Sequence, residues 1–215
     1  MLGIIFTGGE APDTQAIKQL VEKQTQKAEI IIAADSGFLT AQNAGVKPDW
    51  IIGDMDSLGD PAQLAAFEPE RIIRHEHDKD YTDTELAFSL AAEKGCQKIW
   101  IIGGGGGRID HLFGIRSLFE RELFPQRWIT DTADIYCIDT HVQSELSLCL
   151  EKKTIISVFP LGEGPWEAES IGLKWPLNVL EWDRGFFGLS NETTDDRVLV
   201  RAKQGRFMVI LPHIM

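Results

Sequence analysis

The chain has 215 residues, 43% of them hydrophobic and 25% charged, and its mean hydropathy is −0.11. These values are typical of a globular protein with a substantial core, and they exclude a short peptide and a wholly disordered chain. The formal net charge is −12, which disfavours a nucleic acid or an anionic membrane as the main partner because both are negatively charged.

No run of residues approaches the roughly 18 apolar residues of a membrane span, and residues 1–6 lack the basic start of an export signal. The cysteines are Cys96, Cys137 and Cys149, an odd number without a CxxC pair. This pattern argues against a disulfide framework and against a zinc cluster. We therefore expect a cytoplasmic protein that has no membrane segment and binds no nucleic acid.

Short runs of β-branched and apolar residues in the first half of the chain predict buried strands. They cover residues 3–6, 30–34, 50–52, 71–74 and 98–102. Amphipathic stretches between and after these runs predict helices, for example over 17–24 and 112–119. The alternation predicts an α/β N-terminal domain with a mostly parallel, doubly wound sheet.

The clearest predicted helix follows Tyr81. Thr82 and Glu85 have the spacing of a capping box, in which each side chain satisfies a backbone N–H of the other residue. Gly95 is placed to end this helix.

The second half of the chain lacks a convincing helical pattern. Strands are predicted over 133–138, 146–150, 154–159, 198–201 and 206–211, with glycine-containing turns between several of them. The pattern indicates a C-terminal all-β sandwich domain. We place the boundary between domains 1–126 and 127–215.

Carboxylates follow several of the predicted parallel strands. They are Asp35, Asp54, Asp56, Asp80 and Asp83. Ligands bind beyond the carboxyl ends of parallel strands, and carboxylates gathered there repel one another unless a cation lies among them. Oxygen ligands suit Mg²⁺, although any single Asp is also common as a helix cap or turn residue.

A run of five glycines, 103–107, leads into Arg108, Asp110 and His111. Glycines let the backbone approach a ligand closely, and the predicted helix after them directs its N–H groups toward the same place. Arg108 adds a planar group suited to phosphate. The run is neither a Walker A loop nor the dinucleotide-binding fingerprint.

Several segments, in order, resemble the thiamine pyrophosphokinase family. They are 35–37, 48–57, 79–85 and 103–111, together with 172–177 and 188–192 near the C-terminal end. The resemblance implies a catalytic α/β domain that binds ATP and Mg²⁺, followed by a thiamine-binding β-sandwich domain. It also implies a homodimer whose thiamine site lies between the catalytic domain of one subunit and the β domain of the other.

The resemblance also implies roles for particular residues. Those implied to be catalytic are Asp54, Asp56, Asp80, Asp83 and Arg108, with Mg²⁺ held by Asp54, Asp56 and Asp83. Those implied on the ATP side are Asp35, Lys79, Gly105, Gly106, Gly107, Arg108, Asp110 and His111. Those implied to contact thiamine are Ser190, Asn191 and Trp175.

The implied reaction transfers the pyrophosphoryl group of ATP, the co-substrate, to the hydroxyl of thiamine, giving thiamine diphosphate and AMP. Asp54-x-Asp56 behind a strand is also similar to the metal-binding motif of nucleotide-sugar transferases. A third hypothesis is a sensor that binds thiamine or a nucleotide without turnover. The acceptor range among thiamine analogues and the choice between Mg²⁺ and Mn²⁺ stay open.

Overall fold

The structure is a computed structural model, and it describes residues 1–24, 28–56, 64–65, 67–76, 78 and 80–212. The chain divides into two compact units, the first being essentially Met1–Thr132 and the second beginning at Ala133. This division lies after Thr132, a few residues beyond the boundary after residue 126 that we expected from the sequence. The reason is that Arg127–Ile129 forms a strand that pairs with a strand of the first unit.

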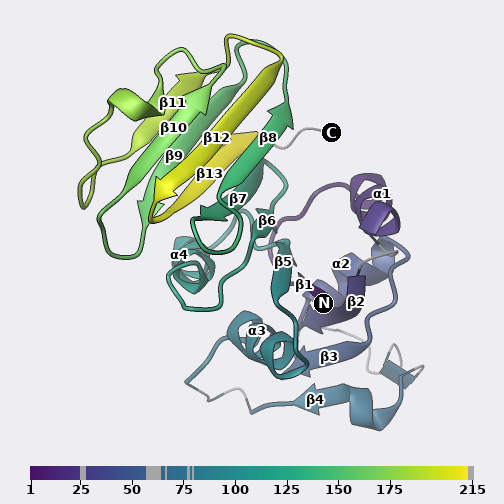
Figure 1. The fold of residues 1–215 in the computed structure, drawn as a ribbon. Helices are drawn as coiled ribbons and strands as arrows, with labels where there is room; N and C mark the ends of the chain where they lie inside the picture. The colour runs from purple at the N-terminus through teal and green to yellow at the C-terminus, as the bar shows by residue number, and fades with distance from the viewer. Residues whose placement is uncertain (25–27, 57–63, 66, 77, 79, 213–215) are drawn as a thin grey trace. The chain divides into compact units, whose positions relative to one another are not determined.

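The first unit contains a parallel sheet with the strand order β6-β5-β1-β2-β3-β4 (Figure 1). Its strands are β1 (Leu2–Phe6), β2 (Ala28–Ala34), β3 (Trp50–Gly53), β4 (Ile72–Arg74), β5 (Lys98–Ile102) and β6 (Arg127–Ile129). Every residue of β1 is buried, because the strand is paired on both sides and covered on both faces. The predicted parallel sheet is confirmed.

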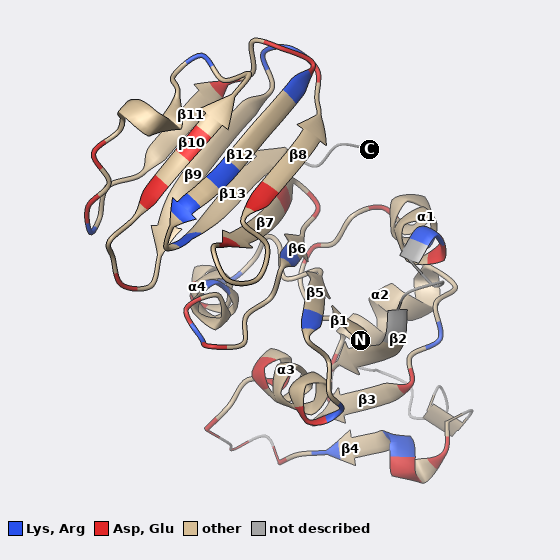
Figure 2. Cartoon of the chain, viewed as in Figure 1, with Lys and Arg blue, Asp and Glu red and all other residues tan. Residues whose placement is uncertain are grey.

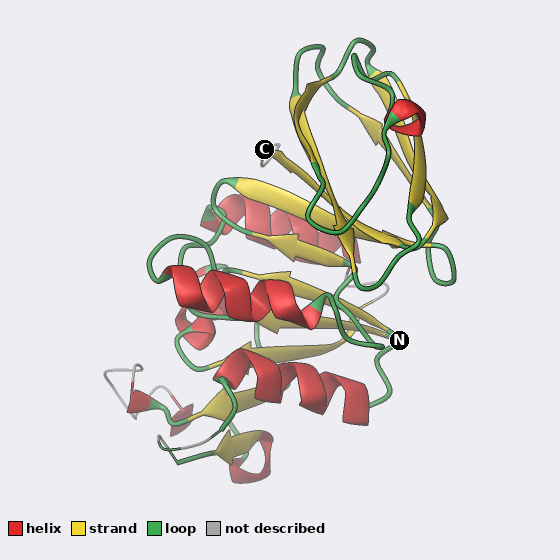
Figure 3. Ribbon diagram, turned by 90° about the vertical axis from the view of Figure 1, so that its left-hand side faces the viewer, coloured by secondary structure: helices red, strands yellow, loops and turns green. Residues whose placement is uncertain are grey.

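In the described part of this unit, α-helices accompany the strands. They are α1 (Thr14–Gln24), α2 (Gly37–Asn43), α3 (Asp83–Glu93) and α4 (Ile109–Leu118), with a short 3₁₀ helix η3 at Pro69–Arg71. The cores beneath α1 and α2 contain Ile17 and Val21 in one cluster and Phe38 in another. The helices occur with the parallel strands, whereas strands and loops make up almost all of the second unit (Figure 3).

The second unit has two antiparallel sheets, with the orders β11-β9-β13-β7 and β10-β12-β8. Its strands are β7 (Ala133–Asp139), β8 (Glu145–Cys149), β9 (Ile155–Leu161), β10 (Glu167–Ile171), β11 (Gly188–Glu192), β12 (Arg197–Gln204) and β13 (Arg206–Pro212), with a 3₁₀ helix η4 at Leu177–Val179. Side chains of both sheets form one buried cluster, which includes Val158 and Phe207 of the first sheet and Ala168 and Val200 of the second. The antiparallel β unit expected from the sequence is confirmed.

Positions of opposite charge lie on neighbouring strands of the smaller sheet, coloured red and blue on the ribbon of Figure 2. Arg201 of β12 lies between Glu145 of β8 and Glu169 of β10, and it forms ion pairs with both. These bonds raise the pKa of Arg201. Opposite charges on neighbouring strands favour this register over a shifted one.

Some elements of the described residues were not expected. The structure adds α2, β6, β10 and β11, and the 3₁₀ helices η3 and η4, to the elements predicted from the sequence. Among the described residues, no helix is long and apolar enough to cross a membrane.

Candidate active site

The strand order places β1 between β2 and β5, so the order of the chain reverses beside β1. Ligands of open parallel sheets bind at such a switch point, beyond the carboxyl ends of the two strands. The loops that leave β1 and β5 are joined there by backbone hydrogen bonds. The N–H of Gly104 donates to the carbonyl of Gly8 (2.8 Å), and Glu10 and Gly105 exchange two bonds of 2.7 and 2.9 Å. The glycine-rich segment is therefore held in place at the switch point.

The shape of this segment depends on glycine. Gly103, Gly104, Gly106 and Gly107 all have positive φ, a conformation that residues with a side chain rarely adopt. A Cβ atom at Gly105 would lie 2.3 Å from Oδ1 of Asp131. The glycine run thus has a defined backbone conformation, and there is no room for a side chain at position 105.

Arg108 precedes α4 and binds Asp110 through two contacts, Nε to Oδ1 at 3.1 Å and Nη2 to Oδ2 at 2.5 Å. These hydrogen bonds raise the pKa of Arg108 and lower that of Asp110. The N–H of His111 also donates to Asp110. All three side chains are exposed, so Asp110 orients the guanidinium at the helix N-terminus without removing it from solvent.

The carboxylates after β2 and β3 occupy unusual backbone positions. Asp35 has a φ of 46°, and its N–H donates to the carbonyl of Ile52 (2.9 Å). Met55 has a φ of 66°, and it lies between half-buried Asp54 and exposed Asp56. The N–H of Asp56 donates to Oδ1 of Asp54 (3.0 Å). Strained conformations of this kind are concentrated at functional sites.

The predicted capping box of α3 is confirmed. Thr82 accepts a hydrogen bond from the N–H of Glu85 (3.2 Å), and Glu85 accepts one from the N–H of Thr82 (3.0 Å). Arg121 adds an ion pair to Glu85 at 2.5 Å. Burial raises the pKa of Glu85, but the hydrogen bonds from Thr82 and Arg121 outweigh it, so the pKa is lowered.

The cap fixes where α3 begins, and two further residues depend on it. Asp83 is the first residue of the helix. The hydroxyl of Thr84 contacts that of Thr7 at 2.5 Å, which ties the start of α3 to the loop after β1. Asp80 lies just before the cap and is exposed. Lys79 lies outside the described residues.

The five aspartates lie on loops or helix starts that follow parallel strands, as expected. Among the residues that the structure describes, however, no three His, Cys, Asp or Glu side chains gather closely enough to hold a metal ion together. The structure therefore places Asp54, Asp56 and Asp83 after the neighbouring strands β3 and β4 without bringing the three together as one metal-binding group.

The residues expected to contact thiamine all belong to the second unit. Ser190 is exposed and has a φ of 56° within β11. Trp175 is 49% exposed, whereas Asn191 is 4% exposed and its side chain binds the backbone of Trp175. The three lie near one another, and they present one exposed hydroxyl and one exposed indole.

Asp131 was not among the residues expected from the sequence. It follows β6, and its Oδ1 is buried beside Gly105 without a hydrogen-bond partner among the described residues. Buried carboxylate oxygens are usually hydrogen-bonded, so this atom marks Asp131 as a candidate site residue. The one sequence signal for a strand before Asp131 is the apolar pair Trp128 and Ile129, which precedes a polar turn. This run is too short to predict a strand.

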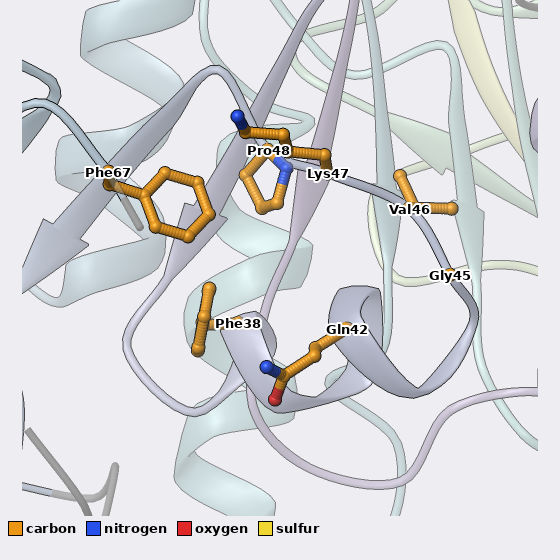
Figure 4. A pocket seen from close by; sticks show the side chains of 7 residues that line it. All are labelled: Phe38, Gln42, Gly45, Val46, Lys47, Pro48 and Phe67. Carbon is orange, nitrogen blue, oxygen red and sulfur yellow. The ribbon is translucent and has the colours of Figure 1, made fainter. Parts of the chain in front are cut away.

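None of the described candidate site residues lines the cavity of about 320 Å³ that Figure 4 shows. It is lined by Phe38, Gln42, Gly45, Val46, Lys47, Pro48 and Phe67. Lys47 and Pro48 lead into the amino end of β3, whereas Asp54 and Asp56 follow its carboxyl end. One lining residue, Phe38, reaches the candidate site through its backbone, since its N–H donates to the carbonyl of Asp35 (3.0 Å).

The fold and the site define a two-unit protein in which a parallel α/β unit with a shaped glycine loop precedes an antiparallel β unit. Two family descriptions match these parts of the chain. "Thiamin pyrophosphokinase, catalytic domain" matches residues 21–128, and "Thiamin pyrophosphokinase, vitamin B1 binding domain" matches residues 141–207. The thiamine pyrophosphokinase of Bacillus subtilis (strain 168) is 31% identical over 163 residues, which cover 72% of this chain and 73% of the relative. The chain belongs to the thiamine pyrophosphokinase family.

Solved structures agree in fold. A thiamine pyrophosphokinase structure from Bacillus subtilis superposes with a TM-score of 0.76 and 26% identity, covering 100% of this chain and 99% of the other. A structure from Geobacillus thermodenitrificans has a TM-score of 0.72 at 24% identity, with 100% and 98% covered. The one from Candida albicans has a TM-score of 0.68 at 15% identity, with 99% and 89% covered, so the fold is similar even where little sequence identity is left.

Proposed function

We propose that the chain transfers the pyrophosphoryl group of ATP to the hydroxyl of thiamine, giving thiamine diphosphate and AMP. The observation that carries the proposal is the glycine loop, fixed at the switch point of a unit that matches the family's catalytic domain. A second unit that matches the vitamin B1 binding domain follows in the same chain. The two parts supply a surface for phosphates and a place for the acceptor.

In the proposed reaction, the thiamine hydroxyl oxygen forms a bond to the β-phosphorus of ATP. The bond from that phosphorus to the oxygen bridging the α- and β-phosphates breaks, and AMP leaves with the electron pair. The hydroxyl proton passes to solvent or to a carboxylate such as Asp80 or Asp83. Such transfers depend mainly on alignment and on neutralising charge.

The residues of the first unit would align and neutralise the phosphates. Backbone N–H groups of Gly106 and Gly107 face phosphate oxygens in this proposal, and Arg108 adds a positive charge at the same loop. Gly105 belongs to the proposed ATP side through the close backbone approach it allows, because its N–H already donates to the carbonyl of Glu10. Asp110 holds the guanidinium by its two contacts. Asp35, Lys79 and His111 complete the proposed ATP side.

The carboxylates fit a magnesium ion in their donor chemistry. Asp54, Asp56 and Asp83 offer only oxygen ligands, and Mg²⁺ commonly takes one or two carboxylates together with waters and substrate phosphates. The described residues hold no group of three such side chains, so the proposal needs waters and substrate phosphates as further ligands. A bound Mg²⁺ would neutralise charge on the phosphate oxygens.

The acceptor side of the proposal belongs to the second unit. Ser190 would contact thiamine by its exposed hydroxyl, and the indole of Trp175 would lie against the cationic thiazolium. We further propose a homodimer in which each thiamine site combines the first unit of one subunit with the second unit of its partner. In this arrangement the units serve as catalytic and thiamine-binding domains.

The finer fold class is also part of the proposal. The strand order, with β1 between β2 and β5, supports a doubly wound sheet. The common core beneath two antiparallel sheets supports a β-sandwich. The cytoplasmic location stays a prediction, supported by three cysteines that form no disulfide.

The proposal is tested by measuring nucleotide products of the purified chain with ATP and Mg²⁺, with and without thiamine, together with the mass of the thiamine product. We expect thiamine-dependent AMP and a product heavier by two phosphoryl groups. ADP with thiamine monophosphate would overturn the chemistry. Binding of a nucleotide sugar in place of ATP would favour the transferase alternative, and thiamine binding without any AMP would favour the sensor.

The metal assignment is tested by Asp56→Asn, which removes one charged ligand at an exposed position. We expect kcat to fall by about two orders of magnitude or more, because charge neutralisation is lost in the transition state. Asp13→Asn is the matched control, since Asp13 caps α1 through Oδ1 and an asparagine retains that acceptor. Near wild-type turnover of Asp56→Asn would remove Asp56 from the metal site.

A further inference from the structure

The strand that carries Ser190 and Asn191 is irregular. β11 pairs antiparallel with β9, and its register shifts between Gly188 and Asn191. At Ser190 the backbone turns to a φ of 56°, and the N–H of Ser190 donates to Oγ of Ser157 (3.1 Å). A bulge of this kind redirects the residues beside it.

The segment 172–175 lies antiparallel beside residues 191–194. Leu173 forms a bridge with Thr193, and the N–H of Lys174 donates to the carbonyl of Glu192 (2.9 Å). Continuing the same register by one residue places Trp175 opposite Asn191. Hydrogen-bonded and non-hydrogen-bonded pairs alternate along an antiparallel ladder. Leu173 and Thr193 form a non-hydrogen-bonded pair, so Trp175 and Asn191 fall at another one, where the two backbones do not bond each other.

The side chain of Asn191 instead bonds both backbone groups of Trp175. The N–H of Trp175 donates to Oδ1 of Asn191 (3.1 Å), and Nδ2 of Asn191 donates to the carbonyl of Trp175 (2.6 Å). The same Oδ1 also accepts the N–H of Glu192 (2.9 Å). A carboxamide has both the donor and the acceptor of a peptide group, so it satisfies the N–H and the C=O of Trp175, which the backbone opposite does not bond at this position.

The indole of Trp175 is exposed to solvent, while the backbone of the same residue is held by hydrogen bonds. Trp175 is 49% exposed, whereas Leu177, two residues later, is fully buried and anchors the chain on its other side. Nζ of Lys174 lies 4.4 Å from the centroid of the Trp175 ring and 3.1 Å from a carboxylate oxygen of Glu192. A cation thus lies within cation–π distance of this ring.

We infer that Asn191 is a positioning residue, whose carboxamide holds Trp175 in place for thiamine and does not itself contact the substrate. The inference rests on the proposed function. It differs from the expected direct contact, because a side chain that is 4% exposed and bonded through both polar atoms has little left to offer a ligand.

The test is a double-mutant cycle on the KM for thiamine, with Asn191→Ala, Trp175→Ala and the double variant in the full-length protein. Asn191→Ala is expected to raise this KM about 10-fold while kcat and the KM for ATP stay near wild type. In the Trp175→Ala background the same substitution should cost nothing further, since its effect passes through the indole. Additive effects of the two substitutions would overturn the inference.

A second variant distinguishes a positioning role of Asn191 from direct contact with thiamine by the direction in which the KM for thiamine changes. Asn191→Asp has nearly the same shape but cannot donate to the carbonyl of Trp175, so we expect its KM for thiamine to rise as in Asn191→Ala. If Asn191 touched the thiazolium directly, the new negative charge would attract it and the KM would fall. Asn178→Ala, at an exposed asparagine of the same segment, is the matched control and should leave the KM unchanged.

The wild-type protein provides a test that needs no folded Asn191 variant. In an NMR titration with thiamine, the indole N–H resonance of Trp175 should shift while the Asn191 side-chain amide keeps its hydrogen-bonded position. A shift of the Asn191 amide as large as that of the indole would overturn the inference. Failure of the proposed function is distinct, because the wild-type protein would then form no thiamine-dependent AMP in the same assay.

Discussion

At Gly105, one added methyl group would meet three neighbours at once. An ideal Cβ there lies 2.3 Å from Oδ1 of Asp131, 2.9 Å from the carbonyl oxygen of Glu10 and 3.0 Å from Cβ of Thr130. Two of these atoms belong to the backbone or sit next to it, so the loop itself would have to move. The position demands glycine for space, since its φ is not in the positive range.

Gly105→Ala is therefore expected to displace the loop and to raise the KM for ATP or lower kcat, by about 10-fold or more in kcat/KM, because a small misplacement of positioning groups is costly. Steady-state kinetics with ATP varied would measure it. Gly114→Ala is the matched control, since a Cβ there meets nothing within 4 Å in helix α4. The control should keep full activity and gain about 0.5–1 kcal/mol of stability. Equal kinetics for both variants would contradict the role given to the loop.

For single residues, the sequence predicts which residues belong to the candidate site better than it predicts the contacts that they make. The glycines and Arg108 were predictable from composition and order, but the bonds between Arg108 and Asp110 depend on side-chain geometry that no spacing rule contains. Asn191 shows the limit most clearly. Its role depends on a bulge at Ser190, and positive φ at a serine is invisible in the sequence.

Among the elements, helix α3 is the one whose start has the most consequence for the site. Its cap joins Thr82 and Glu85, its first residue is Asp83, and Thr84 contacts Thr7. An N-cap hydroxyl satisfies a backbone N–H that has no partner within the helix.

Thr82→Ala should lower the free energy of unfolding by about 1 kcal/mol, as loss of an N-cap hydroxyl does elsewhere. Chemical denaturation monitored by circular dichroism would measure the loss. Ser89→Ala, at an exposed position within the same helix, should change stability by only a few tenths of a kcal/mol, about the difference in helix propensity. A loss in Thr82→Ala no larger than that would mean that the cap contributes nothing.

Glu85 makes this stability depend on pH. Because its pKa is lowered in the folded state, its contribution is present above the pKa of the unfolded chain and is lost as pH falls through the folded value. Glu85→Gln should thus lower the free energy of unfolding near neutral pH. It should also make that free energy depend less steeply on pH in the acidic range. Denaturation midpoints of both proteins, compared from neutral pH downward, would measure it. Parallel curves would contradict the assignment.

The elements missing from the sequence prediction have physical reasons. β6 is only three residues long, and it is stabilised by pairing with β5, which is a long-range interaction. β11 contains Gly188 and the bulge at Ser190, so it lacks a period-two pattern. α2 begins at Gly37, a poor helix former, and tertiary packing of Phe38 and Ala41 overrides that preference.

For the whole molecule, the proposed dimer makes a prediction that a single-chain site does not. A catalytically inactive Asp56→Asn chain and a chain with Trp175→Ala and Ser190→Ala each carry one intact half of the site. In a mixed dimer with sites shared between subunits, one site combines both intact halves and the other combines both damaged halves.

Unfolding and refolding the two variants together, at equal amounts, should restore about a quarter of wild-type activity, because half of the dimers are mixed and each has one intact site. Each variant refolded alone is the control and should stay near its own low activity. No gain on mixing, with a dimer seen by light scattering, would place each site within one subunit.

The central place of β1 in the parallel sheet also bears on how the chain folds. Its partner on one side, β5, follows more than ninety residues later, at Lys98–Ile102. Contacts so distant in sequence form slowly, because the intervening chain must be ordered first. During synthesis, the aspartates that follow β2 and β3 leave the ribosome early. The loop after β5 can contact the loop after β1 only once β5 has paired with β1. Nucleotide binding would then be among the last properties that the first unit acquires during synthesis.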